Sequence, residues 1–170
     1  VAMAPTDLLT LVEETCDGFA RPLVGDAKAF DGLPESSEEL VSPQPTDLAY
    51  IQYTSGSTRF PRGVMIRQAA VLDNLAGIIQ HGVMARAGDR CVSWLPFYHD
   101  MGLVGMVLAP LAAQLSVDYL DTRVFAMRPR RWLELMSKSR ATISLGPPFG
   151  YDLVSRRLRP GEAQRFDLSN

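Results

Sequence analysis

The sequence has few of the residues that build disulfide scaffolds and metal centres. Among its 170 residues are two cysteines, Cys16 and Cys91, and two histidines. Two cysteines far apart form no disulfide framework, and no cluster of histidine, cysteine and carboxylate shows metal-ligand spacing. We therefore expect no metal site in this chain, and we interpret both cysteines as small core residues in a reducing, cytoplasmic compartment.

Net charge and long hydrophobic runs are also lacking. A formal charge of −2 argues against a nucleic-acid-binding protein, which normally presents a basic face. The longest apolar run, residues 101–113, contains Pro110 and is shorter than the about 20 residues that a membrane span needs. No basic start leads into an apolar cleavage segment, so we expect no signal peptide. With 46% hydrophobic residues, the chain can form one domain with a core.

Strand-like and helical patterns alternate along most of the chain. Helical spacing of apolar residues predicts a first helix near residues 8–16, and the polar segment 31–47 is typical of a surface connector. Strands are predicted at 48–53, 64–66, 91–95, 116–120 and 141–145. Helices are predicted at 68–83, 100–113, 129–140 and 149–158. This alternation predicts an α/β fold with a mainly parallel sheet flanked by helices.

The segment Tyr53-Thr-Ser-Gly-Ser-Thr-Arg-Phe-Pro-Arg-Gly-Val64 has the composition of an anion-binding loop. It places four hydroxyls, two glycines and two arginines between two strand-like segments. Glycines let backbone N–H groups approach an anion, hydroxyls add donors, and a guanidinium fits phosphate oxygens. Composition alone leaves a solvated hairpin loop equally open.

The order of residues in this segment resembles the phosphate loop of the adenylate-forming superfamily, which includes acyl-CoA synthetases, fatty acyl-AMP ligases, luciferases and adenylation domains. Each signature position matches except one, where Arg62 replaces a lysine. A Walker-type loop fits poorly, because no Lys-Ser or Lys-Thr follows and the loop enters a strand. The resemblance implies an exposed loop whose residues bind the phosphates of ATP: Thr54, Ser55, Gly56, Ser57, Thr58, Arg62 and Gly63. Arg62 would stabilise departing pyrophosphate or, alternatively, pair with a surface carboxylate.

A second segment, Ser93-Trp-Leu-Pro-Phe-Tyr-His-Asp-Met-Gly-Leu-Val-Gly105, resembles another core motif of this superfamily. Its residues 98–102 are most similar to the fatty acyl-AMP ligase branch, as is the segment 141–153, and the resemblance covers roughly residues 46–170. It implies that His99 is a substrate-adjacent candidate, beside the acyl carboxylate and the α-phosphate; no residue of the chain is assigned as catalytic. The implied acyl-pocket residues are His99, Asp100, Gly102, Phe149, Gly150 and Tyr151. The plain alternatives are that Asp100 caps a helix and that the helix after it is core.

The resemblance implies that residues 1–170 are a fragment of the large N-terminal domain of such an enzyme. Residues 1–47 would form a lead-in helix and connector, and residues 48–170 the phosphate loop and acyl-pocket region. The elements expected for adenine, ribose and magnesium, and the small C-terminal domain, are not found in the sequence. We therefore expect this chain alone to be inactive, and to self-associate through an uncovered sheet edge or an exposed apolar patch.

The implied reaction is ATP-dependent activation of a fatty acid. The carboxylate attacks the α-phosphate of Mg²⁺-bound ATP, which gives an acyl-adenylate and pyrophosphate. The acyl group would then pass to the phosphopantetheine thiol of an acyl carrier protein or a polyketide synthase carrier domain. Two alternatives stay open: an acyl-CoA synthetase that uses CoA as acceptor, and a non-catalytic module that keeps the fold.

Overall fold

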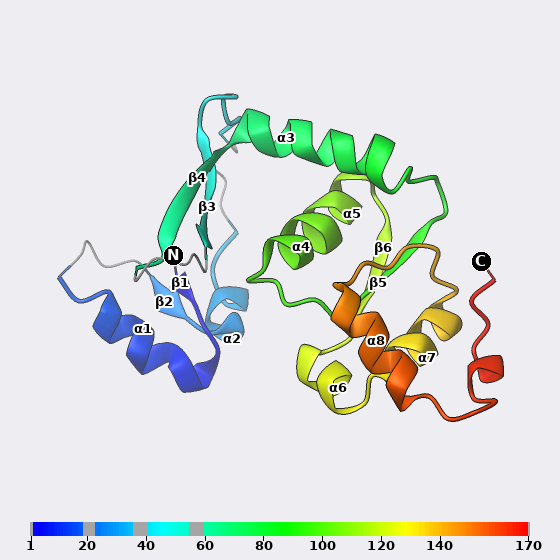
Figure 1. The fold of residues 1–170 in the computed structure, drawn as a ribbon. Coiled ribbons are helices and arrows are strands. Elements are labelled where there is room, and N and C mark those ends of the chain that lie inside the picture. Colours follow the sequence, from blue (N-terminus) through cyan, green and yellow to red (C-terminus); the bar gives the residue numbers. More distant parts are fainter. Residues whose placement is uncertain (1, 19–22, 36–40, 55–59, 170) are drawn as a thin grey trace. The chain divides into compact units, whose positions relative to one another are not determined.

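The computed structural model describes residues 2–18, 23–35, 41–54 and 60–169 (Figure 1). The chain forms two compact units, Val1–Ser42 and Pro43–Asn170. Each unit has its own strands and helices, and the two are described separately.

The first unit pairs two short parallel strands, β1 (Ala2–Met3) and β2 (Val24–Gly25). Between them lie the 3₁₀ turn η1 (Thr6–Leu8) and α1 (Leu9–Thr15), which confirms the predicted first helix. A further helix, α2 (Ala27–Asp31), begins after Asp26, whose carboxylate accepts hydrogen bonds from the Ala29 N–H and the Thr6 hydroxyl, both at 3.0 Å. These bonds lower the pKa of Asp26, as expected for an N-cap carboxylate.

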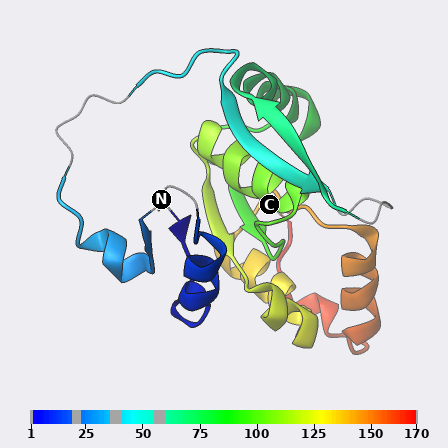
Figure 2. The same ribbon diagram turned by 90° about the vertical axis from the view of Figure 1, so that its left-hand side faces the viewer.

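The second unit opens with an antiparallel hairpin, β3 (Leu48–Thr54) and β4 (Arg62–Arg67), in which Thr54 lies opposite Arg62. It continues into α3 (Gln68–Gly77) and one π-helical turn, η2 (Ile78–Gly82). The first turn of α3 is tied to the chain before β3, because the Gln68 N–H donates to the carbonyl of Asp47 at 2.9 Å (Figure 2). Both predicted strands and the helix are confirmed, with β4 longer by two residues at its start.

A parallel pair, β5 (Arg90–Ser93) and β6 (Ser116–Tyr119), lies at the centre of the second unit. One continuous helical segment connects the two strands: α4 (Asp100–Leu103), the π-helical η3 (Val104–Leu108) and α5 (Ala109–Ala112). The helix predicted at residues 100–113 is therefore confirmed. The α/β class is also confirmed, with parallel pairing at β1–β2 and β5–β6 and antiparallel pairing in the β3–β4 hairpin.

The strand predicted at residues 141–145 is reduced to a single parallel bridge between Ile143 and Cys91. Hydroxyl groups add side-chain bonds to the backbone bonds on either side of this bridge. The Thr142 hydroxyl accepts from the Arg90 N–H at 3.1 Å, and the Ser144 hydroxyl donates to the carbonyl of Val92 at 2.6 Å. Among the described residues 141–145, backbone bonds to Arg90 and Val92 are made by Thr142 and Ile143 alone, so the prediction of a full strand over this range was wrong.

The chain ends in three helices, α6 (Thr122–Met127), α7 (Arg130–Ser139) and α8 (Pro148–Arg157), and the 3₁₀ turn η4 (Ala163–Arg165). Helices α7 and α8 confirm the predictions. Helix α6 was missed because six residues are too few to show a helical period. Its usable signal was Asp121, whose carboxylate accepts from the N–H groups of Arg123 and Val124 at 2.8 and 3.1 Å.

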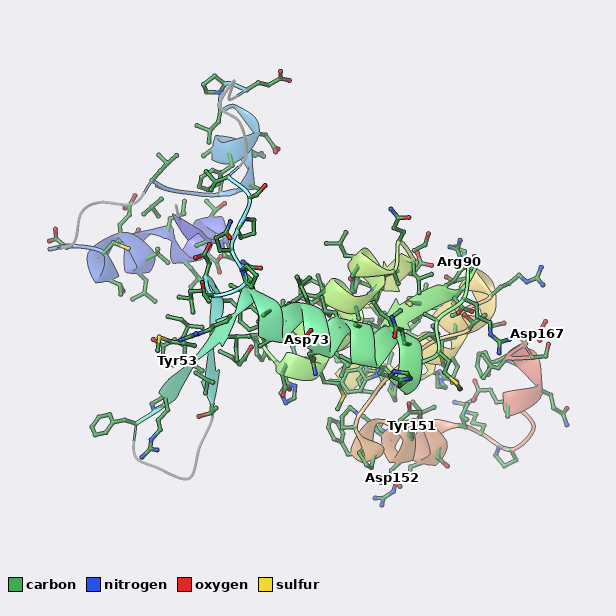
Figure 3. All side chains as sticks on the ribbon, turned by 90° about the horizontal axis from the view of Figure 1, so that it is seen from above. Tyr53, Asp73, Arg90, Tyr151, Asp152 and Asp167 are labelled. Atoms are coloured by element: carbon green, nitrogen blue, oxygen red, sulfur yellow. The ribbon has the colours of Figure 1, made fainter. Side chains whose placement is uncertain are left out.

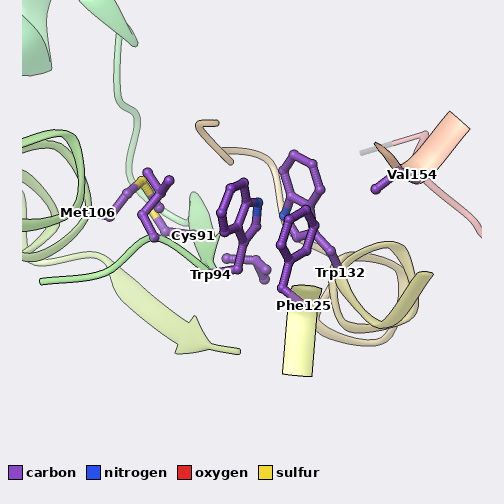
Figure 4. Close-up of a cluster of buried hydrophobic side chains, with 8 residues drawn as sticks. Cys91, Trp94, Met106, Phe125, Trp132 and Val154 are labelled. Atoms are coloured by element: carbon purple, nitrogen blue, oxygen red, sulfur yellow. The ribbon is translucent and has the colours of Figure 1, made fainter. Parts of the chain in front are cut away.

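The core of the second unit lies on both sides of β5. Cys91 and Met106 lie on one side and are nearly inaccessible to solvent (Figure 4). On the other side, Trp94 stacks on Phe125 with ring centroids 3.7 Å apart, and Trp132 meets it edge-on at 6.0 Å. Burial on both faces is typical of a parallel strand covered by helices.

Gly150 in α8 lies directly against the Trp94 ring. A Cβ atom at this glycine would come within 2.7 Å of the ring carbon Cζ2 of Trp94. Because the ring is itself held by Phe125 and Trp132, it has little freedom to move away.

We expect Gly150→Ala to lower the free energy of unfolding by about 1–3 kcal/mol, since it overpacks a rigid contact. Gly77→Ala is the matched control, because no atom lies within 4 Å of its Cβ position in the helix. The control should leave stability unchanged or raise it by up to about 1 kcal/mol. Urea unfolding followed by circular dichroism measures both, and equal stability of the two variants would contradict the packing argument.

Asp89 gives the second unit a dependence on pH. Its carboxylate accepts from the Arg86 N–H at 2.6 Å and from the Thr142 hydroxyl at 2.8 Å, and these bonds lower its pKa from the ordinary 3.8. Folding therefore favours the ionised form. The stabilisation should be complete above pH 3.8 and lost as the pH falls through the lower pKa of the folded state. Asp89→Asn should flatten the acid branch of a stability-against-pH curve, whereas Asp73→Asn, an exposed α3 residue, should leave it unchanged.

Candidate functional site

The hairpin β3–β4 presents the two ends of the predicted phosphate loop. Thr54 ends β3 and Arg62 begins β4, and the Thr54 hydroxyl donates to the Arg62 carbonyl at 3.5 Å, a weak bond. Thr54, Arg62 and Gly63 are exposed to solvent, as expected for a loop that binds a ligand. Ser55, Gly56, Ser57 and Thr58 lie outside the described residues, so their phosphate contacts stay predictions.

Gly63 is explained by a close approach across the hairpin. A Cβ atom at this position would lie 2.8 Å from Cγ2 of Ile51 and 3.4 Å from the ring of Tyr53. A side chain here would push the two strands apart just where the loop leaves them. The glycine therefore keeps Thr54 and Arg62 facing each other.

His99 and Asp100 lie together at the start of α4. His99 is the N-cap residue, and its Nδ1 atom lies 3.2 Å from the Met101 N–H and 2.7 Å from Oδ1 of Asp100. Asp100 is the first helical residue and accepts from the same N–H at 2.7 Å. The plain alternative for Asp100 was the capping position, which the structure gives to His99. The side chains of His99 and Asp100 are 61% and 71% exposed, so a ligand can reach both.

Gly102 is buried beneath the turn that carries His99. A Cβ atom here would lie 2.1 Å from the carbonyl oxygen of Pro96 and 3.3 Å from the Leu95 side chain. Backbone contact therefore requires glycine at this position, and the space that the missing side chain leaves is already filled. The role of Gly102 in this structure is to bring α4 against residues 95–99.

A hollow of about 450 Å³ lies beside this turn, lined by residues 95–98 and 119–123. Phe97 and Tyr119 form an edge-on pair in its wall with ring centroids 5.0 Å apart. Tyr119 donates its hydroxyl to the Met106 carbonyl at 2.8 Å, and burial raises the pKa of its phenol, so it stays neutral.

Sequence reasoning missed residues 119–123. The available signal was their place after a strand. The hollow lies beyond the carboxyl ends of β5 and β6, which run parallel, and ligands of open α/β sheets bind beyond such ends.

Phe149, Gly150 and Tyr151 lie on the first turn of α8, in contact with the two tryptophans. The Phe149 ring meets Trp94 edge-on at 5.9 Å, and the Tyr151 ring meets Trp132 at 5.1 Å. The rings of Phe149 and Tyr151 are half exposed, and Figure 3 shows Tyr151 at the surface of α8. The structure thus groups these residues with the aromatic core, whereas the 450 Å³ hollow is lined by the two other segments.

Within residues 2–18, 23–35, 41–54 and 60–169, no three His, Cys, Asp or Glu side chains are grouped so as to hold a metal ion. None of the helices in these same ranges combines the length and the apolar character of a membrane span.

Known proteins resemble this chain over nearly its whole length. The family model for AMP-binding enzymes matches residues 6–170. A medium-chain-fatty-acid–[acyl-carrier-protein] ligase, TtuA of Teredinibacter turnerae, is 42% identical over 161 residues, which are 95% of this chain and 25% of that protein. The long-chain-fatty-acid–AMP ligase FadD32 of Mycolicibacterium smegmatis is 39% identical over 134 residues, 75% of this chain and 21% of its own length.

Solved structures agree with these relatives. A structure from a study of fatty acyl-adenylate ligases from E. coli and L. pneumophila is 52% identical and superposes with a TM-score of 0.88, over 98% of this chain and 30% of that one. The L. pneumophila fatty acyl-adenylate ligase in complex with acyl adenylate and pyrophosphate is 37% identical, with a TM-score of 0.72 over 77% of this chain and 23% of that one.

The chain spans about a quarter of the length of the curated relatives that it matches first. The resemblance inferred from the two sequence motifs is thus confirmed by the family match, by relatives that are named as fatty-acid ligases and by structures of the same fold. This chain belongs to the AMP-binding enzyme family.

Proposed function

We propose that the protein containing this chain activates a fatty acid as its acyl-adenylate, with ATP as the second substrate. The observation that carries the proposal is the place of the His99 turn. It follows β5 and adjoins a hollow beyond the ends of two parallel strands, lined by aromatic and apolar residues together with Asp121, Thr122 and Arg123. The same unit contains the β3–β4 hairpin with its phosphate-loop sequence. Family membership and the names of the relatives support this assignment.

In this proposal, separate residues bind the phosphates and the acyl chain. Residues 54–63 hold the β- and γ-phosphates, and the hollow takes the acyl chain against Leu95, Phe97 and Leu120. A carboxylate oxygen of the fatty acid bonds to the α-phosphorus, and the bond from that phosphorus to the pyrophosphate oxygen breaks. No proton moves, so the protein has to orient two anions and reduce their repulsion. His99, exposed at the start of α4, is proposed to lie beside the carboxylate.

Mg²⁺ is proposed as the companion of the ATP phosphates. Among the described residues, no three His, Cys, Asp or Glu side chains are grouped so as to hold this ion. We assign part of the neutralisation of the phosphate charge to Arg62, an arginine of the loop segment that is exposed where the loop enters β4.

Carrier-protein transfer is the proposed second half-reaction. It is supported by the similarity to TtuA, which is named as an acyl-carrier-protein ligase. The motif residues 98–102 and 146–152 resemble the fatty acyl-AMP ligase branch of the superfamily. An acyl-CoA synthetase is the second candidate, since both classes share the adenylation step.

Arg62→Gln in the complete protein should lower kcat/KM for ATP by about 10- to 100-fold, the effect of losing about 1.5–3 kcal/mol from a charge-assisted hydrogen bond. Arg67→Gln is the matched control, since Arg67 is an exposed arginine at the other end of the same strand. It should stay within about twofold of wild type. Fatty-acid-dependent ATP–pyrophosphate exchange measures both variants. Failure of the wild-type protein to exchange with any fatty acid would reject the proposed function, and equal losses in both variants would reject the role of Arg62.

With ATP, a medium- or long-chain fatty acid, a phosphopantetheinylated carrier protein and CoA all present, we expect acyl-carrier protein as the main thioester. Mass spectrometry of the products decides between the two acceptors. Efficient acyl-CoA formation would assign the protein to the acyl-CoA synthetases, and the adenylation step would stand in either case.

A further inference from the structure

The structure gathers arginines from two separate segments around one hollow. Its volume is about 160 Å³, and it is lined by the junction between α6 and α7 and by the C-terminal end of α8. The lining residues are Met127, Arg128, Pro129, Arg130, Arg157 and Arg159. Four of the six lining residues are therefore arginines, although the two segments lie almost thirty residues apart in the sequence.

One carboxylate partly balances this charge. Glu162 forms an ion pair with Arg130 and accepts from the Arg159 N–H at 3.0 Å. The Arg159 N–H, followed by the charge of Arg130, lowers the pKa of Glu162, so this carboxylate stays ionised at neutral pH. Glu162 thus neutralises Arg130 and positions the turn that carries Arg159.

Arg128 and Arg157 have no such carboxylate among the residues that the structure describes. Two nearby arginines, one in α7 and one in α8, do have a carboxylate partner. Arg131 pairs with Glu134 at 3.0 Å, and Arg156 pairs with Asp152 at 2.9 Å. Arg131 and Arg156 lie near the hollow but have counter-ions within their own helices, so they are suitable controls for Arg128 and Arg157.

The hollow also lies at the N-terminal end of α7. The N-cap of this ten-residue helix is Pro129, and no side chain caps it. The positive end of the helix dipole therefore adds to the field of the guanidinium groups. Arginine forks match the paired oxygens of phosphate, and arginine clusters are a recurring way to recognise phosphorylated ligands.

We propose that this arginine hollow binds the phosphate group of a ligand, as a site additional to the phosphate loop. The hairpin β3–β4 and α8 lie apart in both Figure 1 and Figure 3, so one nucleotide phosphate would not serve both. Free pyrophosphate and a phosphate ester on a larger molecule, such as 4′-phosphopantetheine, share the required chemistry. The site does not depend on the proposed function, because it is argued from charge and shape alone.

The test is calorimetric titration of the complete protein with three probes: inorganic phosphate, pyrophosphate and 4′-phosphopantetheine, with phosphate-free pantetheine as the blank. Arg128→Gln/Arg157→Gln should weaken binding of at least one probe by tenfold or more. Arg131→Gln/Arg156→Gln removes the same charge from the same two regions and should stay within twofold. The probe that binds best identifies the source of the phosphate.

Controls separate this site from the phosphate loop and from misfolding. Arg62→Gln should still bind the probe that Arg128→Gln/Arg157→Gln binds more weakly than wild type. Because Arg128 and Arg157 are exposed, the double variant should keep the wild-type unfolding curve, and Arg157→Gln alone should give a smaller loss in the same direction. Equal weakening in both double variants would reduce the effect to net charge and overturn the proposal. If Arg62→Gln abolished all binding of the three probes, the phosphate loop would account for it and the proposal would also be overturned.

Discussion

The second unit depends on the packing of Trp94. This residue directly follows β5, stacks on Phe125 of α6, and meets Trp132 of α7 and Phe149 of α8 edge-on. Its carbonyl accepts from the Thr122 hydroxyl at 2.8 Å. One ring thus joins the central strand to three helices. Each aromatic pair contributes about 0.5–1.5 kcal/mol beyond the burial of its area.

The two buried tryptophans differ in the hydrogen bonding of their indole N–H groups. Trp132 donates its indole N–H to the Ser144 hydroxyl at 2.9 Å, whereas Trp94 Nε1 is buried without a hydrogen-bond partner among the described residues. An unsatisfied donor costs about 1–3 kcal/mol. Burying a tryptophan of about 150–250 Å² contributes roughly 4–6 kcal/mol at about 25 cal/mol per Å². Burial therefore outweighs the missing bond, and Trp94 stays in the core.

The same packing places the candidate site. Because Trp94 fixes the end of β5, the following turn is held over Gly102, and His99 is presented at the start of α4. The residues after β6 reach the other side of the hollow from the same edge of the parallel pair. A rigid aromatic core behind an exposed histidine is a suitable support for a site that must orient two anions.

The sequence by itself determined the family, the α/β class, most helices and the two strands around the phosphate loop, because these follow from ordered motifs and short-range periodicity. Only the tertiary structure decided features that join distant segments. Thr142 and Ser144 use hydroxyls where a strand was expected, Gly102 is required by the Pro96 carbonyl, and Arg128 meets Arg157 around one hollow. Each of these depends on which segments pack together. Packing is set by burial of the whole core, which no local pattern of residues contains.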